Sequence, residues 1–169
     1  FRLLKIPYHL VGGRSFYERR EVRDLIAYGN VLLNPDDDVS LLRVINNPPR
    51  GIGETTVQKA LQLSIRQHSS LHAALGAAEL RGEITAASAR SIDAFLDLLR
   101  SFHARLAERA NDPAETMGAL VKTTGYLEEL RRTASGPEDA LNRETNVNEM
   151  LEAMREHARE RSGGLRAFL

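Results

Sequence analysis

The sequence predicts an all-α protein: an irregular helical bundle of about seven to eight helices with helix-hairpin-helix-like turns, preceded by one short extended segment. Two observations indicate this class. Apolar residues recur at intervals of three and four over most of the chain, the period of a helix that buries one face. Short stretches rich in proline, glycine and asparagine separate the periodic segments, and such stretches end helices.

The composition is that of an ordinary soluble globular domain, with 42% hydrophobic and 27% charged residues in a chain of 169. This length suits one domain with a sizeable core. The formal net charge is zero, so binding to nucleic acid would require a local positive patch. The absence of cysteine excludes disulfides and cysteine-ligated zinc and is consistent with a reducing cytoplasm. No apolar run approaches the ~20 residues of a membrane span, so no membrane partner is expected.

The first residues predict one extended segment. Residues 6–11 are expected to be extended, because Pro7 biases Ile6 away from helix, and Gly12-Gly13 ends the segment. A single strand forms no sheet, so we expect this piece to belong to a neighbouring domain. The chain itself is expected to be a fragment that is truncated at its C-terminus.

Two helices are predicted between residues 18 and 46. Ser15 and Glu18 form a capping box for the first, and Asn34-Pro35 ends it. Its buried face is expected to carry Val22, Leu25, Ile26, Leu32 and Leu33, and its polar face Arg19, Arg20, Arg23 and Asp24. Asp36 or Asp37 caps the second helix. The apolar face of that helix is expected to comprise Val39, Leu41, Leu42, Val44 and Ile45.

The remaining helices follow the same pattern. Val57, Leu61 and Ile65 predict a helix over 55–66, and Ser69 or Ser70 caps a short helix that reaches Leu80. Residues 84–108 form the longest helix, whose stripe is Ile92, Phe95, Leu96, Leu99, Phe102 and Leu106. After Pro113, two helices over 116–124 and 126–132 flank Gly125. The last spans 138–161, with Leu141, Val147, Met150, Leu151 and Met154 buried.

The residues offer little for catalysis. Asp36, Asp37 and Asp38 cap a helix better than they hold a metal, because consecutive side chains in a turn rarely converge on one ion. His68 and His72 are spaced four apart but have no third ligand nearby in sequence, so we expect surface residues. No glycine-rich loop for a nucleotide triphosphate and no serine-histidine-aspartate arrangement is present in the sequence. We expect no catalytic residue, metal or cofactor in this chain.

A glycine turn at Gly51-Ile52-Gly53 has two interpretations. It can be a plain helix connection, with Thr55 as the N-cap of the next helix. It can equally contact a nucleic-acid backbone, because amides at a helix N-terminus bind phosphate. Ile52 would then anchor the turn in the core, and Arg50 would place a charge at its mouth. Four basic residues against Glu54 indicate a local positive patch: Arg43, Arg50, Lys59 and Arg66. A weaker second turn is expected at residues 81–85, where Gly82 is alone and Glu83 repels phosphate.

One set of residues carries a family likeness: residues 6–24, Ala27-Tyr28 and residues 34–38, 42–46 and 49–53. In these residues the sequence resembles superfamily 1A DNA helicases of the UvrD/PcrA/Rep type. Later segments resemble the family's S-G-Y helix break (residues 122–126), its R-x-x-N-x-x-E segment (residues 143–149) and its L-x-x-F-L segment (residues 165–169). One departure is Gly29-Asn30, where family members have Leu-Arg, and a glycine inside a helix costs about 1 kcal/mol.

The resemblance implies that residues 1–17 are the tail of motor domain 2A and the hinge, and that residues 18–169 are the helical 2B domain. It implies a hinge at Phe16, Tyr17, Glu18, Arg19 and Arg20. It implies a duplex-backbone contact at Arg50, Gly51, Ile52, Gly53, Thr55, Thr56 and Lys59. The parent would be an ATP-dependent, 3′-5′ DNA helicase of the bacterial cytoplasm that uses ATP and Mg²⁺ and acts in repair or replication.

Partners implied by the resemblance are duplex DNA, bound without sequence preference, the motor domains of the same parent chain, and possible repair proteins. The fragment lacks the ATPase motifs, so we expect it to be inactive alone. The alternative hypothesis is a protein-interaction or autoinhibitory helical module that binds little DNA itself.

Overall fold

The computed structural model describes residues 16–108, 112–160 and 164–169. These residues form ten α-helices and no β-strand, which confirms the predicted all-α class. The count exceeds the expected seven to eight for two reasons. The segment expected to be one helix up to Leu80 is broken at Ala77, and a short helix lies at residues 164–168. The predicted extended segment, Ser15 and the start of the chain lie outside the described residues.

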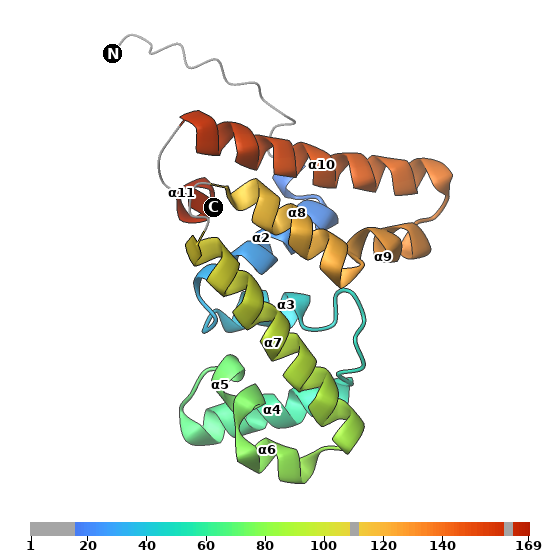
Figure 1. Cartoon of the computed structure of the whole chain (residues 1–169). Helices are drawn as coiled ribbons and strands as arrows, with labels where there is room; N and C mark the ends of the chain where they lie inside the picture. Colours follow the sequence, from blue (N-terminus) through green and yellow to red (C-terminus); the bar gives the residue numbers. More distant parts are fainter. Residues whose placement is uncertain (1–15, 109–111, 161–163) are drawn as a thin grey trace.

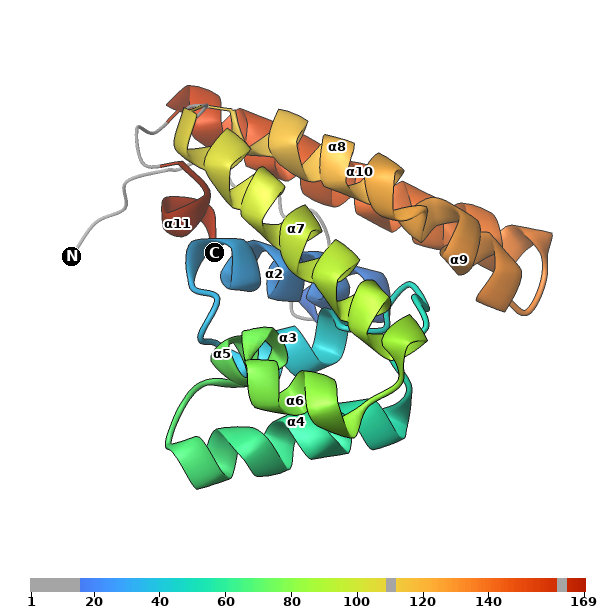
Figure 2. The same ribbon diagram turned by 60° about the horizontal axis from the view of Figure 1, so that its bottom comes forward.

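The helices fall into two groups that one long helix joins (Figure 1). One group contains α8 (Pro113–Thr124), α9 (Tyr126–Thr133) and α10 (Pro137–Glu160), which pack on one another, and α10 also packs on α2 (Arg20–Leu33). The other contains α4 (Glu54–Gln67), α5 (Leu71–Gly76) and α6 (Ala78–Glu83). The long helix α7 (Ala86–Glu108) contacts α8 in the first group and α5 in the second (Figure 2). Between the groups lies α3 (Asp38–Val44), and α11 (Gly164–Phe168) packs on α2 and α10.

Local capping signals set most helix ends as predicted. Asn34 ends α2, and Asp37 caps α3 by accepting a hydrogen bond from the Ser40 amide at 3.1 Å. Ser70 caps α5 in the same way, with its hydroxyl accepting from the Ala73 amide at 3.2 Å. Pro113 begins α8, and Gly125, at φ +69°, separates α8 from α9. Each of these signals acts within four residues, which is why the sequence alone reveals it.

Three helix boundaries differ from the prediction. The first helix begins at Arg20, not Glu18, and its N-cap Arg19 makes no side-chain capping bond. The cap of α4 is Gly53, so Thr55 lies inside the helix instead of capping it. Gly82 also lies within a helix, α6, and the turn that opens α7 falls at Thr85, whose hydroxyl accepts from the Ser88 amide at 3.1 Å.

The buried stripe predicted for α7 is confirmed in full, since all six of its residues are buried. Four other predicted core residues are wrong: Val39 is 81% exposed, Ile65 73%, Leu141 65% and Leu42 39%. In α4 the buried side is formed by Thr56, Ala60, Leu63 and Ser64, because that side faces α5 and α6. Asp24, in contrast, was expected on the exposed polar face of the first helix, but it is buried and only 1% exposed.

Close packing explains why a glycine stands at position 29, although glycine lowers helix propensity. A Cβ atom at this position would lie 2.7 Å from Leu169 Cδ1 and 3.4 Å from Leu165 Cδ2. The glycine therefore lets α11 approach the backbone of α2 closely. The position where the sequence departs from the helicase pattern is the place where these two helices meet.

Candidate nucleic-acid interface

Helix α2 positions the chain that leads into the glycine turn. The Tyr28 hydroxyl donates a hydrogen bond to the Asn47 carbonyl at 2.6 Å, and the Asn47 side-chain amide donates to Asp24 Oδ2, also at 2.6 Å. The peptide bond between Asn47 and Pro48 is cis. Asp24 and Tyr28 lie one turn apart on α2, so a single helical face holds the start of this loop at two points.

Asp24 is the buried centre of this arrangement. Its carboxylate accepts from Arg43 at 2.7 Å and from the Tyr126 hydroxyl at 2.7 Å, in addition to Asn47. A buried carboxylate needs such partners, because burial without them is costly. The three donors come from α3, the turn after it and α9, so one side chain of α2 links segments that lie far apart in the chain.

Burial and the Asp24 carboxylate also raise the pKa of Tyr28 and of Tyr126. Burial, followed by the negative charge of Asp24, raises the pKa of Tyr126 far above its ordinary value. The pKa of Tyr28 is also raised, mainly by burial, although the nearby Arg50 lowers it in part. Both hydroxyls therefore stay protonated and donate hydrogen bonds at neutral pH.

The turn itself uses its two glycines differently. Gly51 has φ +79°, a conformation that glycine adopts without steric cost, whereas Gly53 has φ −63° and serves as the N-cap of α4. Ile52, between them, is buried as expected, and its carbonyl accepts a hydrogen bond from the Asn46 side chain. The apolar anchor thus points inward, and both glycines are exposed.

The N-terminus of α4 is open to solvent. Gly53 supplies no side-chain cap, and Thr55 is exposed, whereas Thr56 is buried and its amide donates to the Gly53 carbonyl at 2.9 Å. Amides at such a helix start attract anions through the partial positive charge of the helix end. Glu54, in the first turn, opposes this attraction.

The four cations expected to surround the turn all make contacts within the chain. The guanidinium of Arg50 lies 4.7 Å from the ring centre of Phe95 and donates to the Tyr28 hydroxyl at 2.6 Å, so it does not stand at the mouth of the turn. Lys59 donates to the Glu83 carbonyl, and Arg66 pairs with the Glu83 carboxylate at 3.1 Å. Arg43 is held by Asp24.

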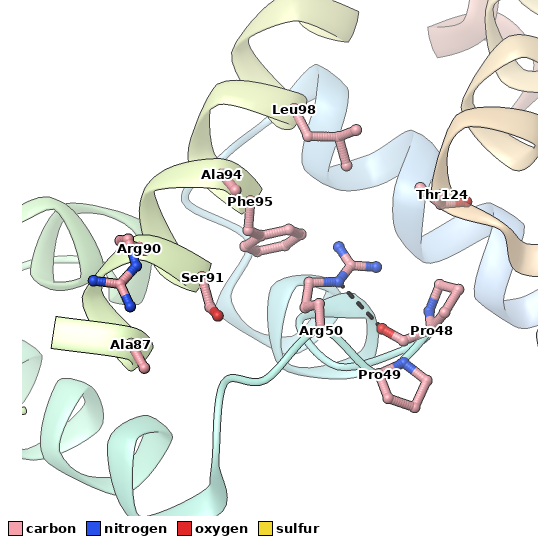
Figure 3. A pocket seen from close by; sticks show the side chains of 10 residues that line it. All are labelled: Pro48, Pro49, Arg50, Ala87, Arg90, Ser91, Ala94, Phe95, Leu98 and Thr124. Atoms are coloured by element: carbon pink, nitrogen blue, oxygen red, sulfur yellow. Dashed lines mark hydrogen bonds between the residues drawn. The ribbon is translucent and has the colours of Figure 1, made fainter. Parts of the chain in front are cut away.

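A pocket of about 530 Å³ opens beside the turn (Figure 3). Pro48, Pro49 and Arg50 form one wall, the first half of α7 forms another, and Thr124 at the end of α8 closes it. Arg90 of α7 lines the pocket and is exposed. The sequence reasoning missed Arg90, because it lies 40 positions from Arg50 and only the packing of α7 brings the two to one pocket.

The predicted hinge residues are divided between core and surface. Phe16 is 1% exposed, Tyr17 is 50% exposed, and Glu18, Arg19 and Arg20 are exposed. Arg19 lies over the Phe16 ring, 5.6 Å from its centre, and donates to the Asn146 side chain. Asn146 in turn donates to Glu21 Oε1 at 2.5 Å. The structure thus fastens the turn at residues 16–20 to the middle of α10.

Residues of the R-x-x-N-x-x-E segment lie next to some of the residues predicted at the hinge. Arg143, Asn146 and Glu149 line a polar pocket of about 590 Å³ together with Arg19, Arg20 and Glu21. They lie on one face of α10, since they are spaced three apart. No sequence pattern had linked residues 143–149 to residues 19–21.

Metal and membrane sites can be assessed only for the described part of the chain. It holds no group of three or more histidine, cysteine, aspartate or glutamate residues that could bind a metal. The aspartates at 37 and 38 instead accept backbone hydrogen bonds, from the amides of Ser40 and Leu71 respectively. Across the same residues, no helix combines the length and the apolar character needed to cross a membrane.

Comparison with known proteins places the chain in a family. The UvrD-like helicase C-terminal domain matches residues 1–166. The chain belongs to this family. Among curated proteins, the chain is 37% identical to an ATP-dependent DNA helicase Rep of Salmonella typhimurium over 152 residues, or 90% of this chain and 22% of that protein. It is 34% identical to a probable DNA helicase II homolog of Rickettsia felis over 151 residues, 89% of this chain and 22% of that protein.

An ATP-dependent DNA helicase PcrA of Leuconostoc citreum is 31% identical over 151 residues, which cover 89% of this chain and 20% of that protein. These matches confirm the resemblance to UvrD-like helicases. The chain spans about a fifth of the length of these relatives. It is therefore a helicase-derived helical domain of the UvrD-like family.

Proposed function

We propose that this chain is the accessory 2B domain of an ATP-dependent DNA helicase, which contacts the backbone of duplex DNA and regulates unwinding by motor domains of the same parent. In this proposal the motor domains use ATP and Mg²⁺ and unwind in the 3′-5′ direction in the bacterial cytoplasm, in repair or replication. The chain's own part is to hold the duplex.

The observation that carries the proposal is the exposed glycine turn at the uncapped start of α4. Gly51, Gly53 and Thr55 are exposed while Ile52 is buried, so the turn presents backbone and a hydroxyl group to solvent at a helix N-terminus. A phosphate group can approach such a backbone closely, and it needs no base contact to do so. Arg50 and Lys59 support the turn from within: Arg50 holds the preceding loop to α2, and Lys59 joins α4 to the end of α6.

The test is a fluorescence anisotropy titration of the 169-residue chain with duplex DNA, comparing the wild type with Gly53→Asp and Gly53→Asn. A Cβ at Gly53 meets no atom within 4 Å, and φ is −63°, so both side chains fit. Asp and Asn are both good N-caps, so neither variant should unfold α4. We expect Gly53→Asp to weaken binding by roughly tenfold, about 1.4 kcal/mol, and Gly53→Asn to have a much smaller effect.

Salt dependence provides a second readout. Phosphate contacts release counterions, so wild-type affinity should fall as salt rises, and the slope should be smaller for Gly53→Asp. Equal binding by all three proteins, or binding that does not respond to salt, would exclude the turn as the DNA contact.

The second candidate function is a protein-interaction or autoinhibitory module. It is favoured by the commitment of Arg43, Arg50, Lys59 and Arg66 to contacts inside the chain, which leaves the turn with few free charges. In that case the chain would bind the separately purified motor domains of its parent and show no measurable affinity for duplex DNA. A titration with duplex DNA and a titration with the motor domains therefore separate the two candidates.

A further inference from the structure

The pocket between Pro48 and Thr124 has donors but few acceptors to offer a ligand. The Arg90 side chain makes no hydrogen bond or ion pair with another described residue, and the Ser91 hydroxyl also has no hydrogen-bond partner among them. Arg50 uses its Nε and one Nη2 hydrogen for Pro48 and Tyr28, which leaves three of its five N–H groups. The Pro48 carbonyl already accepts from Arg50. None of the described residues that line the pocket is acidic.

The rest of the lining is apolar. Pro48, Pro49, Ala94 and Leu98 contribute aliphatic surface, and the Arg50 guanidinium lies next to the buried ring of Phe95, 4.7 Å from its centre (Figure 3). The pocket therefore combines two cations with a surface that an apolar side chain can cover.

This combination selects among possible ligands. The smooth outer backbone of a duplex does not fill a recess of about 530 Å³, so the occupant must protrude from its parent molecule. An unstacked nucleotide base has donor groups on its edge, and leaving a donor unpaired on burial costs about 1–3 kcal/mol. Among the lining side chains only the Ser91 and Thr124 hydroxyls can accept from those donors, and none is a carboxylate or an amide. A carboxylate accepts only, and an aromatic or large aliphatic side chain beside it requires no polar partner.

We propose that this pocket binds an acidic peptide segment of a partner protein, in which one aromatic or large aliphatic side chain is flanked by carboxylates. The apolar side chain occupies the space between Pro49 and Ala94, and the carboxylates bind Arg50 and Arg90. This site is separate from the glycine turn and does not rest on the DNA-binding proposal. A protein partner and duplex DNA can then occupy neighbouring surfaces of the same domain.

The test uses a fluorescein-labelled synthetic peptide, Gly-Asp-Glu-Asp-Phe-Asp-Glu-Gly, in an anisotropy titration with the 169-residue chain. Ala94→Trp fills the pocket without changing charge, and Ala94 is exposed, so the variant should fold. We expect saturable binding by the wild type and a loss of roughly tenfold or more in Ala94→Trp and Arg90→Glu. Arg23→Glu is the matched control, since the Arg23 side chain is exposed, has no hydrogen-bond or ion-pair partner among the described residues and does not line the pocket.

Peptide controls separate the two parts of the recognition. Replacing the phenylalanine of the peptide with serine, or its carboxylates with amides, should each weaken binding. Duplex DNA affinity should be unchanged in Ala94→Trp, and peptide affinity should be unchanged in Gly53→Asp, so failure of one proposal is distinguishable from failure of the other.

Three results would overturn the peptide site. The first is the absence of saturable binding to the wild type. The second is equal weakening by Arg23→Glu and Arg90→Glu, which would show that only overall charge matters. The third is displacement of the peptide by single-stranded oligothymidine together with loss of oligothymidine binding in Ala94→Trp, which would assign the pocket to nucleic acid.

Discussion

Asp24 is a buried carboxylate that joins three separate segments of the chain. Arg43, Asn47 and Tyr126 each donate to it within 2.7 Å, and its neutral partners come from the loop before the glycine turn and from α9. The geometry of the turn therefore depends on a residue that never touches it. Removal of one donor should be tolerated better than removal of the carboxylate, because two partners remain.

Tyr126→Phe tests this network. We expect a loss of about 1–2 kcal/mol in the free energy of unfolding at pH 7, since one buried hydrogen bond disappears and the ring stays. The raised pKa of Tyr126 stabilises the fold below the unfolded value of about 10, and this contribution is lost as the pH rises from there toward the folded pKa. Urea unfolding at pH 7 and above pH 10 should thus show a shallower alkaline decline in the variant. Tyr17→Phe, at a half-exposed tyrosine, should match the wild type.

The two glycines of the turn can be distinguished by the same substitution. Gly51→Ser should destabilise the fold by about 1–2 kcal/mol, because φ is +79° and the new Cβ would lie 3.1 Å from Ser91 Oγ. Gly53→Ser should leave stability unchanged or raise it by a few tenths of a kcal/mol, since serine is a better N-cap in open space. Thermal unfolding of both variants measures the difference, and equal losses would contradict the distinct roles.

At the scale of helices, short side-chain caps connect neighbouring elements. Asp37 caps α3 through the Ser40 amide and also accepts from the Ser40 hydroxyl at 2.7 Å, while Asp38 accepts from the Leu71 amide at the start of α5. The hydrogen bonds from Ser40 lower the pKa of Asp37. Two aspartates of the acidic run, Asp37 and Asp38, thus cap the start of α3 and bond the start of α5, respectively.

Asp37→Ala should lower the free energy of unfolding by about 1 kcal/mol at pH 7, and Asp37→Asn by less, because asparagine also caps. The depressed pKa means that the charge of Asp37 stabilises the fold above the unfolded value of about 3.9, and this contribution is lost as the pH falls through the folded pKa. Urea unfolding at pH 7 and pH 3 should show the gap between wild type and Asp37→Ala shrinking in acid. Asp36→Ala, at an exposed neighbour, serves as the control.

For the whole molecule, the long helix α10 fastens the residues expected at the hinge. Asn146 accepts from Arg19 and donates to Glu21, which lie about 125 positions earlier in the chain. Glu21 and Asn146 are both buried, so this contact is part of the interior of the domain. In the proposed role beside a motor, movement of the domain would therefore carry Phe16 and Arg19 along with α10 as long as this contact holds.

Asn146→Ala should remove both bonds and lower the free energy of unfolding by about 1–3 kcal/mol, because the Glu21 carboxylate loses a buried donor. Hydrogen exchange at the Arg19 and Arg23 amides should accelerate, since both are bonded within the turn that Asn146 holds. Asn148→Ala, at an exposed position of the same helix, should change neither quantity. Unchanged exchange in Asn146→Ala would show that the turn is held by Phe16 alone.

Some features were predictable because they depend on neighbours within four residues. Asn34, Asp37, Ser70, Pro113 and Gly125 were all recognisable as helix ends, since capping and backbone conformation are local. The buried stripe of α7 was recognisable because apolar residues that recur with the helical period over a 23-residue helix leave only one consistent buried face. The family was also recognisable from its residues, and its match over residues 1–166 confirms it.

Only the tertiary structure decided which face of a short helix is buried. Val39, Ile65 and Leu141 have the right period and lie in solvent, because the neighbours of α3, α4 and α10 cover another side. It also decided that Asp24 lies inside, that Arg50 turns toward Phe95 and Tyr28, and that Arg90 joins Arg50 at one pocket. Local sequence therefore determined most of the helix ends, whereas long-range packing determined which charges remain free to meet a partner, because burial depends on the atoms that other segments bring.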